Sequence, residues 1–178
     1  MSNTHFLGLI FGGARSGKSA RAETLALSRG LTPIYLATAQ AGDSEMRERI
    51  EVHQTSRADK GWTTIEEQRD IKTILADQLA ADRIILIDCL TLWLTNILLA
   101  DADIEQEISG LSDALDARKG PVICVSNEVG LGIVPDNALA RAFRDHQGRL
   151  NQRIAAIATH VEFVAAGLPL TVKEHPHA

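Results

Sequence analysis

The segment Gly12–Ser19 carries residue types that bind phosphate. It reads Gly-Gly-Ala-Arg-Ser-Gly-Lys-Ser and matches the pattern GxxxxGK[ST] at every fixed position. Glycines let the backbone curl so that several N–H groups point at phosphate oxygens. Lys18 would add a positive charge at the β- and γ-phosphates, and the Ser19 hydroxyl would bind Mg²⁺. We therefore expect a nucleoside triphosphate here, held by Gly12, Gly13, Ala14, Arg15, Ser16, Gly17, Lys18 and Ser19.

The stretches on either side of this segment favour the same interpretation. The apolar run Phe6–Phe11 precedes it as a strand would, and Ser19–Arg29, rich in Ala, Leu, Glu and Arg, follows it as a helix would. A helix in that place would direct the positive end of its dipole at the bound anion. The alternative, a chance glycine-rich turn, is disfavoured because both neighbouring elements are present.

Asp88 offers a carboxylate for the metal. It ends the run Ile84–Ile87, whose continuous apolar character predicts a strand buried on both faces, as in a parallel sheet. Parallel strands bring the residues at their C-terminal ends to one edge of the sheet, where ligands bind. Asp88 is therefore expected to bind Mg²⁺ together with Ser19. The alternative is a strand-end acid that only faces water.

A nucleophile is harder to choose among the six histidines. If residues 43–56 form a helix, Met46, Ile50, His53 and Arg57 lie near one face. A neutral His53 imidazole could attack phosphorus there, with Arg57 near the developing charge. On these residues alone, a partly buried structural histidine is favoured over a nucleophile.

The segment Asn127–Pro135 has two glycines two residues apart, followed by a proline. It comes after a predicted strand, so it is either a loop that binds a second substrate at the edge of the sheet or an ordinary connection to the next helix. Four arginines on that helix form either a solvated face or a site for a phosphorylated substrate: Arg141, Arg144, Arg149 and Arg153.

Strands and helices are expected to alternate along the chain. Short apolar runs predict strands at 6–11, 34–37, 83–88, 121–125 and 161–165, with a short edge strand at 170–172. Helical periodicity predicts helices at 19–29, 43–56, 71–79, 91–99, 104–115 and 137–159. The fold class is therefore α/β, with a mainly parallel sheet that carries helices on both faces. Residues 1–178 are expected to form one domain.

Composition excludes several classes of protein. The chain has 178 residues, 45% of them hydrophobic and 23% charged, with a net charge of −5. These values are ordinary for a globular protein, and the acidic balance gives no reason to bind nucleic acid. Cys89 and Cys124 are expected to be buried, reduced thiols. No export signal or membrane span is recognisable, so a cytoplasmic location is expected.

Several segments together resemble one enzyme family. They are Gly12–Ser19, Tyr35–Gln40, the 43–57 segment with His53, Asn127–Pro135, Leu139–Asp145 and Gly148–Gln152. The chain resembles, almost end to end, the bifunctional adenosylcobinamide kinase / adenosylcobinamide-phosphate guanylyltransferases of cobalamin biosynthesis. The resemblance implies a P-loop NTPase-like (RecA-like) fold and two reactions. In the first, ATP or GTP phosphorylates adenosylcobinamide. In the second, GTP transfers GMP to adenosylcobinamide phosphate and releases pyrophosphate.

The resemblance also implies roles for individual residues. His53 matches the histidine that carries GMP covalently in the family, which reverses the preference stated above for a structural histidine. Asp88 stands where familiar members carry Glu, and Val52 stands where another His can occur. The family is also expected to form a homo-oligomer, a homotrimer. The implied nucleotide contacts outside the glycine-rich segment are Ala37, Thr38, Ala39, Gln54, Thr55, Ser56, Arg57, Glu66 and Asp88.

Two other functions are compatible with the phosphate-binding segment. One is a simpler kinase of a small hydroxylated metabolite, which would need no histidine intermediate. The other is a nucleotide-dependent switch that works by ordering its loops. His53 and the segment Asn127–Pro135 favour the bifunctional enzyme over both.

Overall fold

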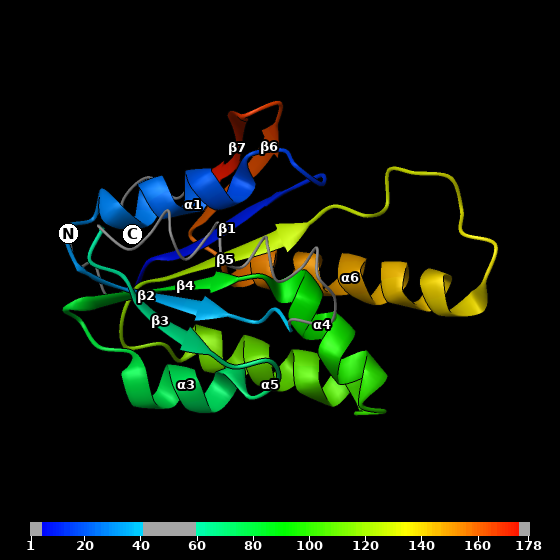
Figure 1. Cartoon of the computed structure of the whole chain (residues 1–178), viewed down its shortest axis with the longest axis horizontal. Coiled ribbons are helices and arrows are strands. Elements are labelled where there is room, and N and C mark those ends of the chain that lie inside the picture. The colour runs from blue at the N-terminus through cyan, green and yellow to red at the C-terminus, as the bar shows by residue number, and fades with distance from the viewer. Residues whose placement is uncertain (1–4, 41–59, 175–178) are drawn as a thin grey trace.

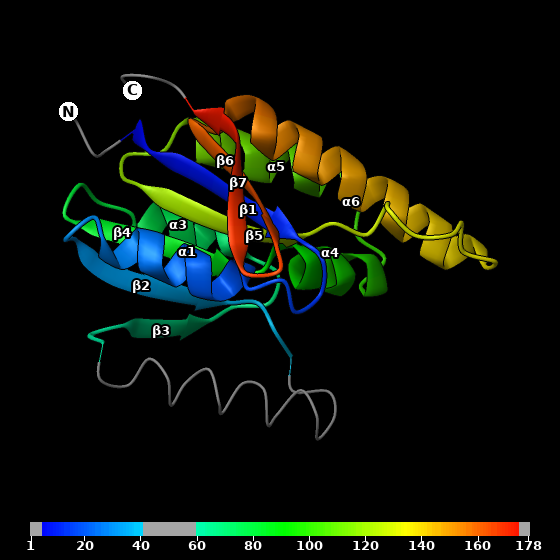
Figure 2. The same cartoon turned by 90° about the horizontal axis from the view of Figure 1, so that it is seen from above.

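A seven-stranded sheet organises the chain. The computed structural model describes residues 5–40 and 60–174. The strands lie in the order β3-β2-β4-β5-β1-β6-β7, and every neighbouring pair is parallel except β6 and β7 (Figures 1 and 2). Their bounds are β1 Leu7–Gly12, β2 Thr32–Ala37, β3 Thr63–Glu66, β4 Arg83–Asp88, β5 Val122–Asn127, β6 His160–Ala165 and β7 Leu168–Glu174.

Helices cover both faces of this sheet. Figure 1 shows α1 (Lys18–Leu27) on one face, whereas α3 (Ile71–Gln78), α5 (Ile104–Asp116) and α6 (Ala138–Ile157) lie on the other. Helix α4 (Leu90–Leu99) follows β4 directly. Among the described helices, none is long and apolar enough to cross a membrane.

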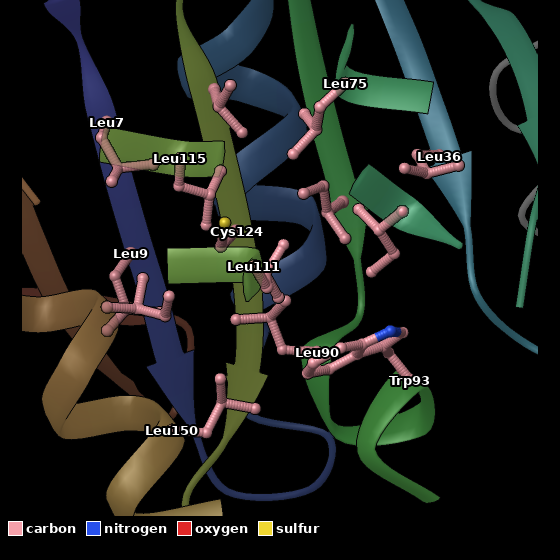
Figure 3. Packing of buried hydrophobic residues seen from close by; sticks show 14 of the residues in the cluster. Leu7, Leu9, Leu36, Leu75, Leu90, Trp93, Leu111, Leu115, Cys124 and Leu150 are labelled. Atoms are coloured by element: carbon pink, nitrogen blue, oxygen red, sulfur yellow. The ribbon is translucent and has the colours of Figure 1, made fainter. Parts of the chain in front are cut away.

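The central strands are apolar on both sides because each face of the sheet has its own core. Leu9 and Cys124 point to the side of α3 to α6, where they pack with Trp93 and Leu111 (Figure 3). Ile87 of β4 belongs to the same cluster. Their neighbours along the same strands point to α1 and pack with Ala22 and Ala26; these are Ile10, Leu86, Ile123 and Val125. Continuous apolar runs therefore predicted these strands correctly, since alternate residues are buried on opposite faces.

Side chains cap three of the helices within residues 5–40 and 60–174. Asp70 accepts a hydrogen bond from the backbone of Thr73 in α3, Asp103 does the same for α5, and Asn137 for α6. Helix α1 begins after Gly17 without a side-chain cap. Its first N–H groups therefore point toward the glycine-rich loop, where an anion would meet them.

The observed elements agree with most of the sequence-based expectations. The parallel sheet, the helices on both faces and the two free, buried cysteines are confirmed. Strand β3 was missed because its residues Thr63–Glu66 lie at the edge of the sheet, mostly exposed, and so form no apolar run. Strand β7 is longer than the expected 170–172. The helix expected at 43–56 lies outside the described residues.

Candidate active site

The glycine-rich loop connects β1 to α1 and has the curled backbone that its sequence predicts. Arg15 and Gly17 have positive φ angles of 55° and 94°. The Ser16 N–H donates to the carbonyl of Gly13 at 3.3 Å, and the Lys18 Nζ donates to the same carbonyl at 3.1 Å. Lys18 thus folds back over the loop, and its ammonium group is in place to meet an anion bound there.

Gly12 is required at its position because no other residue has room. A Cβ at Gly12 would lie 2.3 Å from the Val164 carbonyl oxygen and 2.9 Å from the Ser16 Oγ. The first contact is with backbone of the neighbouring strand β6, which cannot swing aside as a side chain can. The loop is therefore packed directly against β6.

Asp88 lies at the end of β4 and points to the face of the sheet that carries α1. Its Oδ2 accepts a hydrogen bond from the Tyr35 hydroxyl at 2.9 Å, and Tyr35 belongs to the core beneath α1. Burial raises the pKa of the adjacent Cys89 thiol to about 11; the Asp88 charge adds to the rise and the Lys18 charge opposes it. The Asp88 and Lys18 charges therefore both act on the Cys89 thiol, in opposite directions.

The donor types at the loop and at β4 fit Mg²⁺. The Ser19 hydroxyl and the Asp88 carboxylate are hard oxygen ligands of the kind this ion prefers. Among the described residues, no group of three or more His, Cys, Asp or Glu could hold a metal ion by itself. Phosphate oxygens and water would therefore complete the coordination, as is usual for Mg²⁺. Strand β5 separates β1 from β4, which places Asp88 about 10 Å across the sheet from the loop.

Thr38 lies just past β2, and the fold itself uses its hydroxyl group. The side chain is fully buried (0% exposed). Its Oγ1 donates to the Cys89 carbonyl and accepts from the Cys89 N–H, both at 2.8 Å. The Asn96 side chain donates to the Thr38 carbonyl at 2.9 Å. The Thr38 side chain therefore holds the C-terminal ends of β2 and β4 together.

The structure brings Ala37, Glu66 and Asp88 into register on three neighbouring strands. Ala37 of β2 pairs with Glu66 on one side and with Asp88 on the other. Glu66 is four strands from the glycine-rich loop, about 19 Å across the sheet. The expected contacts from His53 to Arg57 lie outside the described residues. Ala39 follows Thr38 and is partly buried.

A buried polar network at the end of β5 was not foreseen from the sequence. The Ser126 Oγ donates to the Asn151 Oδ1 at 2.6 Å, and the Gln147 Nε2 donates to both residues. The Asn151 side chain also donates to the Asn127 carbonyl at 3.1 Å. A usable signal was present, since Gln147 and Asn151 are spaced i, i+4 on a helix and hence share one face.

This network fixes the start of the loop 128–137 beside the glycine-rich loop. The Glu128 N–H donates to the Gly12 carbonyl at 3.0 Å. From there the chain extends well away from the sheet before it reaches α6 (Figures 1 and 2). It exposes large apolar side chains, of which Leu131 is 84% and Ile133 98% exposed. Exposed apolar side chains of this kind are typical of a surface that binds another molecule.

The four arginines of α6 are held by contacts within the chain. Arg141 donates to the carbonyls of Pro135 and Asp136 and so ties the loop to the helix. Arg144 pairs with the neighbouring Asp145, and Arg149 and Arg153 both pair with Glu105 of α5; these are exposed ion pairs. The interpretation as a solvated face is therefore favoured over a site for a phosphorylated substrate.

An ion pair anchors α1, which carries Lys18 and Ser19, to strand β6. The Arg21 guanidinium donates to both oxygens of Glu162, at 2.7 and 2.6 Å, and the His160 Nε2 lies 3.0 Å from the same carboxylate. Glu162 is only 2% exposed. The hydrogen bond from Arg21 lowers the pKa of Glu162; burial opposes this, and His160 adds to the decrease.

Glu162→Gln is expected to lower the free energy of unfolding by about 2 kcal/mol at pH 7. Because the folded-state pKa of Glu162 lies below its unfolded value near 4.3, this stabilisation is present above about pH 4.3 and is lost as the pH falls through the folded-state pKa. Urea unfolding of both proteins at pH 7, 5 and 3 should show the difference shrinking on acidification.

Glu105→Gln is the matched control, since Glu105 is 47% exposed in its pairs with Arg149 and Arg153. Glu105→Gln should lower the free energy of unfolding by less than about 1 kcal/mol. If both variants lowered the free energy of unfolding by the same amount, an anchoring role for Glu162 would be contradicted.

Comparison with known proteins gives the chain its family. Residues 8–172 match the family described as cobinamide kinase / cobinamide phosphate guanyltransferase. The chain belongs to this family. It is 47% identical over 170 residues to the bifunctional adenosylcobalamin biosynthesis protein CobP of Pseudomonas aeruginosa, with 94% of this chain and 98% of that protein covered. It is 41% identical over 180 residues to CobU of Salmonella typhimurium, covering 93% and 98%.

Solved structures with low sequence identity share the fold. The flagellar accessory protein FlaH of Methanocaldococcus jannaschii superposes with a TM-score of 0.55 at 14% identity, covering 97% of this chain and 80% of that one. A protein of Pyrococcus horikoshii OT3 gives a TM-score of 0.58 at 12% identity, covering 98% and 89%. These proteins share the α/β fold with a mainly parallel sheet, as expected. The family match makes the chain a bifunctional cobinamide kinase and cobinamide phosphate guanylyltransferase.

Proposed function

We propose that one nucleotide site performs both reactions of this family and that His53 carries GMP between them. A triphosphate held by the loop Gly12–Ser19 gives its γ-phosphoryl group to the hydroxyl of adenosylcobinamide in the first reaction. In the second, GTP gives GMP to adenosylcobinamide phosphate through His53. The observation that carries the proposal is the curled loop with Lys18 folded over it, in a chain that matches the family from residue 8 to 172.

In the kinase step, the loop and Lys18 stabilise negative charge on the triphosphate. Backbone N–H groups of the loop and of the start of α1 donate to phosphate oxygens, and the Lys18 ammonium compensates charge at the β- and γ-phosphates. Ser19 and Asp88 would hold Mg²⁺. The chemistry supplied by that ion is neutralisation of phosphate charge. Either ATP or GTP can serve as the phosphoryl donor in this step.

In the transfer step, a neutral His53 nitrogen attacks the α-phosphorus of GTP. A P–N bond forms, the bond to the β-phosphate oxygen breaks, and pyrophosphate leaves with its electron pair. A phosphate oxygen of adenosylcobinamide phosphate then attacks the same phosphorus, and the P–N bond breaks to release the imidazole. The products are adenosylcobinamide-GDP and free His53, so the covalent step divides one transfer in two.

The other proposed nucleotide contacts lie at or just beyond the C-terminal ends of β2 and β3, or follow His53 in the sequence. Ala37, Thr38 and Ala39 are proposed to pack against the nucleotide there, since the Thr38 hydroxyl is committed to Cys89 and the Thr38 N–H donates to the Asp88 carbonyl. Glu66 lies too far from the loop to reach the phosphates, so we assign it to the base or the ribose. Gln54, Thr55, Ser56 and Arg57 follow His53 in the sequence and are proposed to contact GTP with it.

GTP labelled at the α-phosphate tests the function directly. After incubation with Mg²⁺ and denaturation, the protein should carry an acid-labile, base-stable label, as expected for a phosphoramidate. Addition of adenosylcobinamide phosphate should remove the label before denaturation. Cobinamide phosphorylation without label would favour the simple kinase. Nucleotide binding without either reaction would favour the switch.

We also propose that the enzyme is a homotrimer in the cytoplasm. The apolar side chains of the loop 128–137 support an interface between copies, because exposed apolar patches of this kind mark protein contacts. Light scattering should give three times the 19.3 kDa of the chain. The double variant Leu131→Asp, Ile133→Asp is expected to lower that mass to the monomer value. A monomeric unmodified protein would contradict this proposal.

A further inference from the structure

The turn between β6 and β7 lies against the glycine-rich loop, although the two are about 150 residues apart in the sequence. The Gly167 N–H donates to the Ser16 carbonyl at 2.8 Å. A Cβ on Gly17 would lie 3.2 Å from the Gly167 Cα. The last strand of the sheet, β7, therefore brings its turn into direct backbone contact with the predicted phosphate-binding loop.

This contact fixes the direction of the Gly17 N–H. In a planar trans peptide, the carbonyl of one residue and the N–H of the next point in opposite directions. Because Gly167 holds the Ser16 carbonyl on the hairpin side, the Gly17 N–H must point away from the hairpin. Gly17 immediately precedes α1, where the backbone N–H groups of such a loop meet phosphate. A flipped peptide would present a carbonyl oxygen to the anion instead.

The shape of the turn is costly, and β7 offers little burial to offset it. Ala166 and Gly167 have φ angles of 52° and 80° and form a two-residue turn between the paired residues Ala165 and Leu168. Two successive positive φ values are the signature of a type I′ turn, and they disfavour most side chains. All but one residue of β7 is exposed. The turn with positive φ angles thus lies where the hairpin meets the loop, on a strand that adds little to the core.

We propose that the β6–β7 turn braces the phosphate-binding loop and that Gly167 is a positioning residue for nucleotide binding. Gly167 acts through the Ser16–Gly17 peptide. The proposal rests on the proposed function in one respect, namely that the loop holds a triphosphate. It predicts that loosening the turn weakens binding of the phosphate chain itself, whatever base is attached.

Gly167→Val tests the brace because a Cβ at Gly167 has open space around it, so the variant strains the backbone without a clash. The dissociation constants of GTP and of inorganic tripolyphosphate should both rise about tenfold. An increase of this size corresponds to the loss of one hydrogen bond to a charged group. Gly167→Asn, which tolerates positive φ better, should retain more of the affinity than Gly167→Val. If Gly167→Val fails to fold, Gly167→Ala replaces it, with an increase of about threefold expected.

Gly30→Val is the matched control. Gly30 also has a positive φ, of 66°, and open space for a Cβ, but it lies beyond the C-terminal end of α1. Both valine variants should lose thermal stability, and only Gly167→Val should lose affinity. Unchanged affinity in a folded Gly167 variant overturns the brace alone. An unmodified protein that binds neither GTP nor tripolyphosphate overturns the proposed function and the brace with it.

Discussion

Replacing His53 with alanine is expected to abolish the covalent GMP label and the transferase reaction while the kinase reaction continues. The imidazole nitrogen is the atom that forms the P–N bond, and alanine offers no substitute. Loss of a nucleophile costs about 10⁴-fold or more in rate. The kinase reaction needs only the loop, Lys18 and the metal ligands, so phosphorylation of adenosylcobinamide should remain measurable. Both rates are measured on the same preparations, with labelled GTP and with adenosylcobinamide.

His5→Ala is the control for the loss of an imidazole. His5 is exposed and precedes β1. It therefore lies at the N-terminal end of this strand, whereas the glycine-rich loop follows the C-terminal end. The label and both reactions should persist in this variant. A His53→Ala protein that still takes up the α-phosphate label would mean that another residue is the nucleophile, and the two-step mechanism through His53 would be abandoned.

Lys18→Ala is expected to reduce both reactions, each by about 10² to 10³-fold, the usual cost of one preorganised charge at a phosphoryl centre. The single ammonium group lies over the loop that serves both steps, with its Nζ 3.1 Å from the Gly13 carbonyl. GTP should also raise the thermal unfolding midpoint of the unmodified protein and fail to raise that of Lys18→Ala, because stabilisation by a ligand follows its affinity.

Lys119→Ala controls for the general loss of a positive charge. Lys119 is exposed and lies between α5 and β5. It is therefore near the N-terminal ends of the parallel strands, whereas the glycine-rich loop lies at their C-terminal ends. Its removal should leave both rates and the shift in unfolding midpoint as they are. Loss of only one reaction in Lys18→Ala would show that the two steps use different phosphate sites, contrary to the proposal of a single site.

The sequence predicted the parts of the fold and site that follow from local patterns. Strands β1, β4 and β5 are buried on both faces, so each gives an apolar run that needs no knowledge of its partners. The curled loop follows from its glycines, and the position of Asp88 follows from the end of β4. These features depend on residues that are neighbours in the chain.

The rest depends on contacts that sequence patterns do not encode. Strand β3 is short and exposed, so its pairing with β2 leaves no periodic signal. The requirement for glycine at position 12 comes from Val164, and the anchor of α1 joins Arg21 to Glu162. The family resemblance named Thr38 as a neighbour of the nucleotide, and only the structure reveals that its hydroxyl is committed to Cys89.

The place of β1 in the sheet has a consequence for biosynthesis on the ribosome. Strand β1 is translated before both of its partners in the sheet, β5 and β6, and more than 100 residues separate it from the nearer one. Gly12 meets Val164 of β6, and Ser16 meets Gly167 in the turn that follows β6. The glycine-rich loop can therefore acquire its full set of contacts only after β6 and the turn that follows it have left the ribosome. Until then the apolar strand β1 lacks its partners, and shielding by solubilising factors would protect it from aggregation.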